Sequence, residues 1–163
     1  MNTTRIATAV LATGLATAAF LGTSAAANAA TTPATAASYE AQVLTLTNQE
    51  RAKVGCAALT ANTQLATAAK AHNDEMAKTG TMTHAGVNGS TPATRIEAAG
   101  YVWKMAGENV AYGQKTPTQV MTDWMNSPAH KANLLNCGYK DLGVAYTTDA
   151  KGRAYWTQNF GSR

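Results

Sequence analysis

The N-terminal 29 residues have the pattern of a secretory signal, and this pattern sets how much of the chain is left to fold. Arg5 precedes an apolar run over residues 7–21, and a stretch of small residues then ends in Ala27-Asn28-Ala29. The run is diluted by threonine and glycine and is shorter than the roughly 20 apolar residues of a membrane-spanning helix. We therefore expect a signal peptide over residues 1–29, removed after Ala29, and a secreted protein without a transmembrane anchor.

Removal of this segment leaves enough chain for one ordinary domain. Of the 163 residues, about 134 remain, which is within the usual size of a single domain. Residues 30–38 carry no charged and no large apolar side chain, so we expect a flexible leader there. The globular domain is expected over residues 39–163, as a monomer.

Two cysteines remain in the mature chain, Cys56 and Cys137. An exported chain meets an oxidising compartment, which favours a disulfide between them. Such a bond would remove on the order of 4 kcal/mol of denatured-state entropy in the simple loop model. Two unrelated free thiols are the alternative, whereas a zinc site is not favoured because there is no CxxC spacing and no third sulfur.

The charge of the chain is mildly positive. The whole sequence carries a net charge of +4, and Arg5 of the signal supplies one of these charges. The basic residues, Arg95 among them, are scattered singly, so no run of them could neutralise a row of phosphates, and we expect no nucleic-acid partner. Weak attraction to an anionic wall polymer or membrane surface stays open beside the simpler interpretation of a solvated surface.

Apolar spacing predicts a first helix directly after the leader. The helix is expected to start at Tyr39 with Ser38 as its cap and to end at Gly55. Its apolar face is expected to consist of Val43, Leu44, Leu46 and Val54.

Caps and breakers predict the remaining elements. Further helices are expected over residues 62–80, 91–100, 116–125 and 127–135, and strands over 105–113, 142–146 and 154–160. Ser127 is expected to cap the helix that follows it. Residues 81–90 form a glycine- and threonine-rich loop. Because helices come first and a strand hairpin last, the pattern favours an α+β fold with helices packed on a small, mostly antiparallel sheet.

Three polar residues stand in motifs that could carry chemistry. His84 lies in the loop string MTHAG, Glu108 follows a glycine in the strand-like string GENVAYG, and His130 follows a Ser-Pro break. Imidazole and carboxylate groups can together bind a divalent metal or share a proton near neutral pH. A lone histidine is also a common hydrogen-bonded structural residue, so both interpretations stay open. Sequence signatures of nucleotide-binding loops, nucleophile elbows and HExxH zinc sites are absent from the chain.

Other polar and aromatic residues have simpler interpretations. His72 is interpreted as a helix-face or packing residue, and Asp74-Glu75 as a solvated acidic pair. Asn109, Asn133 and Gln158 could hold loops through bonds to the backbone or line a cleft. The aromatic residues expected in the core are Trp124, Tyr155, Trp156 and Phe160.

Several strings, taken together, resemble those of one known family. MTHAG, GENVAYG, WMNSPAHKANLL, DLGVAY and YWTQNFG occur in the order seen in bacterial members of the CAP superfamily, which comprises cysteine-rich secretory, antigen 5 and pathogenesis-related proteins. NQER and ATAAKAHNDEMAKTG are similar to that family's first two helices. The resemblance covers about residues 40–161.

The resemblance implies a three-layer α-β-α sandwich with a cleft in which two histidines and acidic residues converge. His84 and His130 match the two cleft histidines, and Glu108 matches the first cleft glutamate. The second glutamate of the eukaryotic pattern falls near Asn126 and Ser127, which are not acidic. At most three of the four groups are therefore present, and a site made of them would hold zinc weakly and exchangeably.

The resemblance favours a secreted binding or interaction module. Its ligand would be a small lipid or a cell-wall-derived molecule, held in the cleft or in an adjacent apolar groove, and the protein could remain near the cell wall. The alternative is a metal-assisted hydrolase, a protease or an esterase, in which His84, Glu108 and His130 activate water. No serine or cysteine shows a recognisable base partner in the sequence, so a covalent mechanism is not expected.

Overall fold

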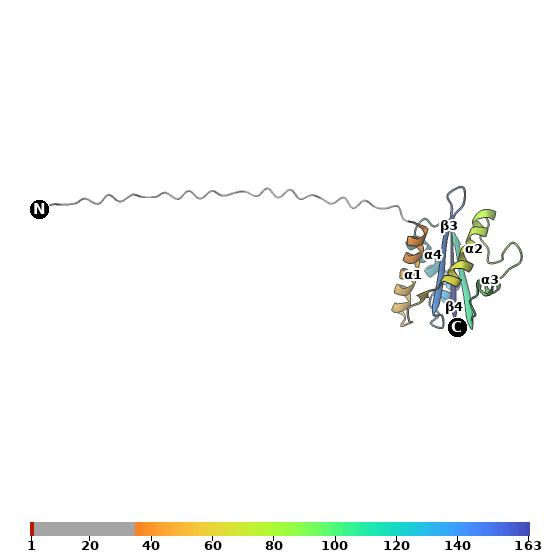
Figure 1. The fold of residues 1–163 in the computed structure, drawn as a ribbon, viewed down its shortest axis with the longest axis horizontal. Coiled ribbons are helices and arrows are strands. Elements are labelled where there is room, and N and C mark those ends of the chain that lie inside the picture. Colours follow the sequence, from red (N-terminus) through yellow and green to blue (C-terminus); the bar gives the residue numbers. More distant parts are fainter. Residues whose placement is uncertain (2–34) are drawn as a thin grey trace. The chain divides into compact units, whose positions relative to one another are not determined.

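The structure is a computed structural model that describes residue 1 and residues 35–163 (Figure 1). The expected signal peptide, apart from Met1, and residues 30–34 of the expected leader lie outside the described residues. None of the described helices combines the length and the apolar character that crossing a bilayer requires.

The described residues form five helices and one four-stranded mixed sheet, which confirms the α+β class. The helices are α1 (Ala36–Lys53), α2 (Thr63–Thr79), α3 (Pro92–Ala98), α4 (Pro117–Asn126) and α5 (Pro128–Leu134). The strands are β1 (Thr60–Ala61), β2 (Met105–Tyr112), β3 (Asp141–Thr148) and β4 (Ala154–Ser162). The strand order is β1-β3-β4-β2, and only the β1–β3 pair is parallel.

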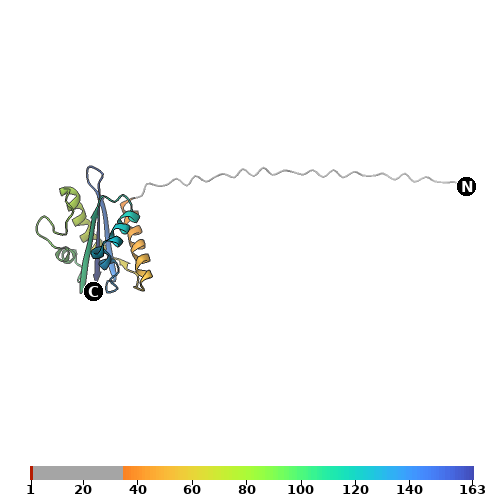
Figure 2. The same ribbon diagram turned by 180° about the vertical axis from the view of Figure 1, so that it is seen from behind.

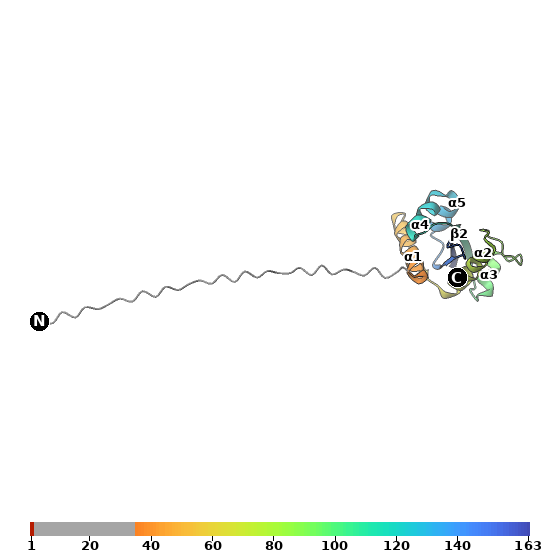
Figure 3. The ribbon, with the colours of Figure 1, turned by 90° about the horizontal axis from the view of Figure 1, so that it is seen from above.

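The sheet is the middle layer of three. Helices α2 and α3 cover one face, and α1, α4 and α5 cover the other (Figures 2 and 3). The larger apolar core fills the space between the sheet and α1, α4 and α5, and includes Trp124, Trp156 and Phe160. A smaller core under α2 and α3 includes Leu65, Ile96 and Tyr101. The four aromatic residues expected in the core are all buried.

Helix α1 begins earlier than its apolar residues suggest. Thr35, not Ser38, is the N-cap, and its side chain accepts a hydrogen bond from the Ser38 amide. Ala36–Ser38, expected in the leader, therefore form the first turn of the helix. Val54 lies outside the helix and is exposed, which contradicts its expected place on the buried face.

The buried face of α1 is partly polar. Val43, Thr47 and Arg51, spaced four residues apart, are its buried residues. Because Thr47 and Arg51 are polar, a search for apolar residues at helical spacing does not identify them as buried. Their burial depends on partners supplied by distant parts of the chain.

Helix α2 has the expected caps and lies close against the sheet. Asn62 caps its start, and Gly80 ends it in the left-handed conformation with a φ of 71°. Gly143 of β3 faces this helix, where a Cβ would overlap the backbone of Leu65 and Ala66. The alanine-rich face of α2 and a glycine in the strand together allow this close approach.

Strand β2 is an edge strand whose outward carbonyls are satisfied by side chains. The Tyr139 hydroxyl donates to the Ala106 carbonyl (3.3 Å), Asn133 Nδ2 to the Glu108 carbonyl (3.2 Å) and Trp124 Nε1 to the Val110 carbonyl (3.3 Å). These bonds come from α4, α5 and the segment after α5. They cover an edge that would otherwise pair with another strand.

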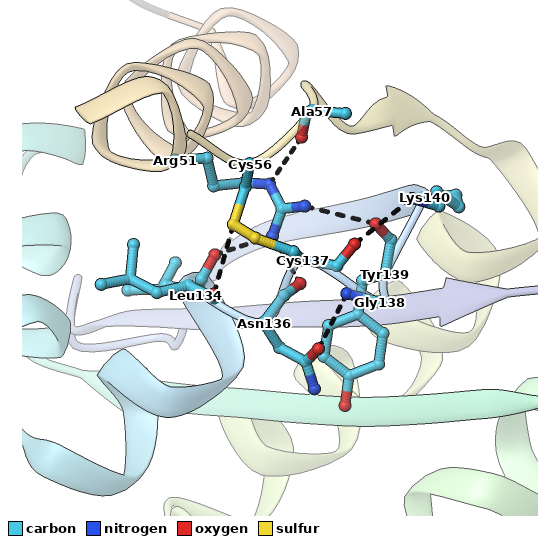
Figure 4. Close-up of a disulfide and its surroundings, with 10 residues drawn as sticks. Arg51, Cys56, Ala57, Leu134, Asn136, Cys137, Gly138, Tyr139 and Lys140 are labelled. Atoms are coloured by element: carbon cyan, nitrogen blue, oxygen red, sulfur yellow. Dashed lines mark hydrogen bonds between the residues drawn. A yellow bond between two sulfur atoms is a disulfide. The ribbon is translucent and has the colours of Figure 1, made fainter. Parts of the chain in front are cut away.

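The expected disulfide between Cys56 and Cys137 is present, with 4.9 Å between the two Cα atoms. Beside it, Arg51 is fully buried and donates only to main-chain carbonyls (Figure 4). These are the carbonyls of Ala57 (3.0 Å), Leu134 (3.0 Å), Asn136 (2.8 Å) and Tyr139 (3.2 Å). We call Arg51, the disulfide and these four carbonyls the Arg51 clamp. It joins the end of α1 to the segment that follows α5.

Candidate functional site

The site lies at the edge strand β2, where the two helical layers meet. Alternation along the strand sends Glu108 to the face covered by α2 and α3, and Asn109 to the face covered by α1 and α5. Glu108 stands opposite Asn159 of β4, and Asn109 stands opposite Gln158. The strand thus carries one polar residue toward each helical layer.

Glu108 is a buried carboxylate, with 1% of its side chain exposed, and it holds His84 directly. His84 Nδ1 donates to Oε1 at 2.9 Å. Arg95 Nη2 of α3 donates to both oxygens, at 3.1 Å and 2.9 Å. The Asn159 amide, oriented with its nitrogen toward Glu108, donates to Oε2 at 3.1 Å. The carboxylate is therefore surrounded by donors from the loop, from α3 and from β4.

Arg95 is the main participant that the sequence does not indicate. Its side chain is 9% exposed, and besides Glu108 it donates to the carbonyls of His84 (3.0 Å) and Ser90 (3.1 Å). In the sequence it is one of the scattered basic residues interpreted as surface charges. The one local signal is its place in a short helix, directly before the buried Ile96.

The loop that carries His84 spans residues 81–90, and we call it the cleft loop. Helix α2 fastens it through two side chains. His72 Nε2 lies 2.6 Å from the Thr83 carbonyl, and Glu75 Oε1 accepts from the Val87 amide at 2.8 Å. Glu75 is thus not the freely solvated residue expected from the sequence, because it anchors the loop. His72 is buried, as its interpretation as a packing residue requires.

His130 reaches the site from the other helical layer. Its Nδ1 lies 2.8 Å from Ser127 Oγ, and its carbonyl accepts from Asn109 Nδ2 at 3.2 Å. Ser127 is the N-cap of α5, as expected, but its side chain makes no capping bond, because the hydroxyl bonds the histidine instead. Burial, and secondly the charge of His84, lower the pKa of His130 from its ordinary value.

The asparagine and glutamine residues singled out in the sequence form a chain of hydrogen bonds. It begins in α5, the helix that also carries His130, and runs across β2 and β4 to α1. Asn133 Nδ2 donates to Asn109 Oδ1 (2.9 Å), and Asn109 Nδ2 donates to Gln158 Oε1 (3.2 Å). Gln158 Nε2 in turn donates to Thr47 Oγ1 at 3.0 Å. The side chains of Asn109 and Asn133 also bond the backbone, as expected, while that of Gln158 bonds only side chains in the described residues. This chain fixes α5 on the edge of β2.

A hollow of about 210 Å³ opens beside His130 and runs along β2. Most of its wall is apolar, and His130 and Ser127 stand together in it. Met82, on the cleft loop, also lines it and is partly exposed. The lining residues are Met82, Val110, Ala111, Tyr112, Gln114, Asp123, Trp124, Ser127 and His130.

The fourth group of the expected cleft, the second glutamate, falls near Asn126 and Ser127, and the structure shows where these two residues lie. Asn126 lines a separate groove between α1 and α4, and Ser127 bonds His130. The acidic residue that faces the hollow is Asp123, one helical turn before Ser127, and its Oδ2 accepts from Gln114 Nε2 at 2.8 Å.

The geometry offers imidazole rather than carboxylate groups to a metal. Within the described part of the chain, no three His, Cys, Asp or Glu side chains are grouped so as to hold an ion. Glu108 accepts four hydrogen bonds, which occupy the roughly four lone-pair positions of a carboxylate. The Nδ1 atoms of His84 and His130 face Glu108 and Ser127. The Nε2 atoms of the two histidines make no hydrogen bond with the described residues.

A sequence comparison identifies the family. The model of the cysteine-rich secretory protein family, CAP, matches residues 44–160. The chain is 36% identical over 128 residues to the uncharacterized protein YkwD of Bacillus subtilis. That match covers 78% of this chain and 49% of YkwD, so the chain spans about half the length of this relative.

Two of the solved structures with the same fold are a bacterial extracellular protein and a bacterial surface protein. An extracellular protein containing an SCP domain from Bacillus anthracis superimposes with a TM-score of 0.71 at 26% identity, covering 78% of this chain and 41% of that one. An outer surface protein from Borrelia burgdorferi gives a TM-score of 0.70 at 25% identity, covering 74% of this chain and 90% of that one. Together with the disulfide, these neighbours are consistent with an extracellular protein.

Proposed function

The chain belongs to the cysteine-rich secretory protein (CAP) family, and we propose that it is a secreted module that binds a small apolar ligand at the edge of β2. The observation that carries this proposal is the hollow beside His130. Apolar side chains make up most of its wall, and a few polar side chains, Ser127 and His130 among them, also line it. Binding sites for small molecules commonly have this composition.

The size of the hollow limits the ligand. Its volume of about 210 Å³ is below the roughly 300–1,000 Å³ of sites for drug-sized molecules. A short acyl chain fits this volume and the apolar wall, and the Nε2 atom of His130 could bind its polar head. Between a lipid and a cell-wall fragment, the lining therefore favours the lipid.

Titration with fatty acids of graded chain length, followed by tryptophan fluorescence, tests this proposal. Trp124 lines the hollow, so its emission should respond to a bound acyl chain. Met82→Trp, at a side chain that is 41% exposed, should fill the hollow and weaken binding at least tenfold. Met125→Trp is the matched control, since Met125 lines the groove of about 240 Å³ between α1 and α4.

The outcomes separate the two apolar sites and the two ligand classes. Loss of binding only in Met125→Trp would place the ligand in the groove between α1 and α4. Binding of muropeptides without any binding of fatty acids would overturn the assignment of a lipid. Unchanged binding in both variants would contradict both sites.

For a divalent metal, we propose that the Nε2 atoms of His84 and His130 are the protein ligands and that Glu108 only orients His84. A bound zinc ion would supply a Lewis acid at the mouth of the hollow. Calorimetric zinc titration should then show loss of binding in His84→Ala and in His130→Ala. Glu108→Gln should retain weaker binding. Complete loss of zinc binding in Glu108→Gln alone would contradict this division of roles.

One observation favours a second candidate function, an esterase. Ser127 Oγ lies 2.8 Å from His130 Nδ1, and a lowered pKa keeps His130 in the neutral form that can accept a proton. This contact gives Ser127 a neighbouring imidazole, which the sequence does not indicate. Hydrolysis of short-chain nitrophenyl esters that is abolished in Ser127→Ala would establish this activity, whereas a binding module shows no turnover in the parent protein.

Secretion is supported by the export signal in the sequence and by the disulfide. We expect the protein in the culture supernatant of a native host, with Ala30 as its first residue. Mass spectrometry of the secreted protein tests the cleavage site, and fractionation of the cell wall tests its retention there.

A further inference from the structure

The buried histidine of α2 faces two hydrogen-bond acceptors. His72 Nδ1 lies 3.1 Å from Glu75 Oε2, and Nε2 lies 2.6 Å from the Thr83 carbonyl. None of the His72 side chain is exposed, so water cannot replace either partner. A carbonyl oxygen only accepts, which places a proton on Nε2.

The other ring nitrogen also needs a proton. Glu75 accepts from the Val87 amide through Oε1 while Oε2 faces His72, which is the arrangement of an ionised carboxylate. Burial pushes the pKa of Glu75 upward, but hydrogen bonds from Val87 and His72 and the charges of His72 and Arg95 outweigh it. The pKa of Glu75 therefore lies below its ordinary value. The geometry places the second proton: Glu75 Oε2 is an acceptor that faces Nδ1, and a proton on Nδ1 completes the bond.

The cleft loop closes tightly over this pair. A Cβ on Gly86 would stand 3.2 Å from Glu75 Oε2. The loop meets His72 at Thr83, directly before His84, and meets Glu75 at Val87, three residues after it. The segment that carries His84 is thus fastened to α2 at both ends.

We propose that His72 is a positioning residue that, as an imidazolium paired with Glu75, fixes residues 83–87 and so holds His84 against Glu108. The proposal extends the site of the proposed function, but it does not depend on which ligand that site takes. It assigns a role in the site to two α2 residues that touch neither the hollow nor Glu108. Loss of either charge leaves a buried hydrogen-bonding group without its partner.

The first test is the protonation of His72 at pH 7. The chain contains three histidines, so long-range proton–nitrogen NMR spectra can be assigned with His84→Asn and His130→Asn. We expect both ring nitrogens of His72 to show the shifts of protonated positions. A single neutral tautomer at His72 would overturn the proposal.

The second test measures whether the pair positions the loop. Glu75→Gln keeps an acceptor for the Val87 amide but removes the charge, and His72→Gln keeps one donor for Thr83. In each, exchange of the Val87 amide should be faster by about tenfold, as expected for loss of one charge-assisted hydrogen bond. The His84 ring resonances should shift as well. The double variant should add little to either single variant, because the two residues act as one unit.

Asp74→Asn is the matched control, because it removes a neighbouring negative charge from the same helix. Asp74 pairs with the exposed Lys70 and does not contact the cleft loop in the described structure. Unchanged Val87 exchange and unchanged His84 resonances in Glu75→Gln would overturn the proposal. If His72→Gln does not fold, Glu75→Gln and the protonation measurement decide the question.

Discussion

The side chains of Arg51 and Arg95 are both largely buried and both donate hydrogen bonds to loop carbonyls, but their other partners differ. Arg51, at the disulfide end, donates to four main-chain carbonyls and to no carboxylate. Arg95, at the cleft, bonds both oxygens of Glu108 and two loop carbonyls. One arginine therefore ties backbone segments together, while the other also compensates a buried charge.

The difference in partners also separates a structural region from the candidate site. In the Arg51 clamp, every polar group is satisfied by neutral backbone and the connection is also covalent, so little is left to react. Burial lowers the pKa of Arg51, yet an arginine remains protonated at physiological pH. At the cleft, His84 and His130 are held through Nδ1 by single side-chain hydrogen bonds, to Glu108 and to Ser127. The clamp therefore leaves no side-chain group for a ligand, whereas the cleft presents two imidazole rings.

Removal of the disulfide should have the largest effect on stability. Cys56 and Cys137 are separated by 81 residues, and opening a loop of this size should lower the free energy of unfolding by about 4 kcal/mol. Urea denaturation of the Cys56→Ala/Cys137→Ala variant measures this loss, and reduction of the parent protein should reproduce it. A loss below about 1 kcal/mol would mean that Arg51 alone holds the two segments.

Arg51→Met should lower the free energy of unfolding by about 3 kcal/mol, because it leaves buried carbonyls without donors. Arg51→Lys, which keeps the charge but not the planar fork, should fall between Arg51→Met and the parent. Urea denaturation measures both. The His84 NMR signals should stay unchanged, and a shift in them would show that the two regions are coupled.

Arg95→Met should cost a similar amount of stability, about 3 kcal/mol, and it should also disturb the cleft. Without Arg95, the buried Glu108 loses its cation and two loop carbonyls lose their donor. Urea denaturation and the His84 NMR spectrum measure the two consequences. Arg153→Met is the control, because it breaks an exposed pair with Asp149 and should change neither quantity. An undisturbed His84 in Arg95→Met would contradict the role assigned to this arginine.

Acidification should lower the free energy of unfolding less than the substitutions of the cysteines, Arg51 or Arg95 do. The loss should come from His130 in the cleft. The pKa of His130 is lowered in the folded protein, so the unfolded chain binds the proton more readily. The contribution of His130 to stability is therefore complete above its unfolded pKa of about 6.5 and is lost as the pH falls from there toward the lower folded value. Denaturation between pH 7.5 and 5 should show this loss, and His130→Asn should reduce it. An equal loss in the variant would assign the pH dependence to other groups.

Helix boundaries set by local chemistry could be predicted from the sequence. Asn62 and Gly80 cap α2 as expected, and Thr91 and Thr116 cap helices that begin with proline. These signals depend on hydrogen bonds within a few residues. The two-residue strand β1 carries no comparable pattern, and it forms only because β3 lies beside it.

The candidate site could be predicted only in part. His84 and Glu108 are identified by motifs that resemble those of a family, and the structure brings the two into contact. His130 approaches from the other face of the sheet, and the roles of all three remain proposals. The roles of Arg95 and Glu75 were missed because their partners lie on other elements. A single charged residue in a helical stretch of sequence does not indicate which distant residue it will bond.

The sequence by itself determined the family, the cysteine pair and the order of the helices and of the three longer strands, because these depend on motifs, on chain chemistry and on local hydrogen bonds. Only the tertiary structure decided which polar groups are buried and what compensates them. Thr47, Arg51 and Arg95 look like surface residues in the sequence, yet donors and acceptors from remote segments surround them. A buried polar group is stable only when folding supplies its partner, and that partner is set by the arrangement of the three layers.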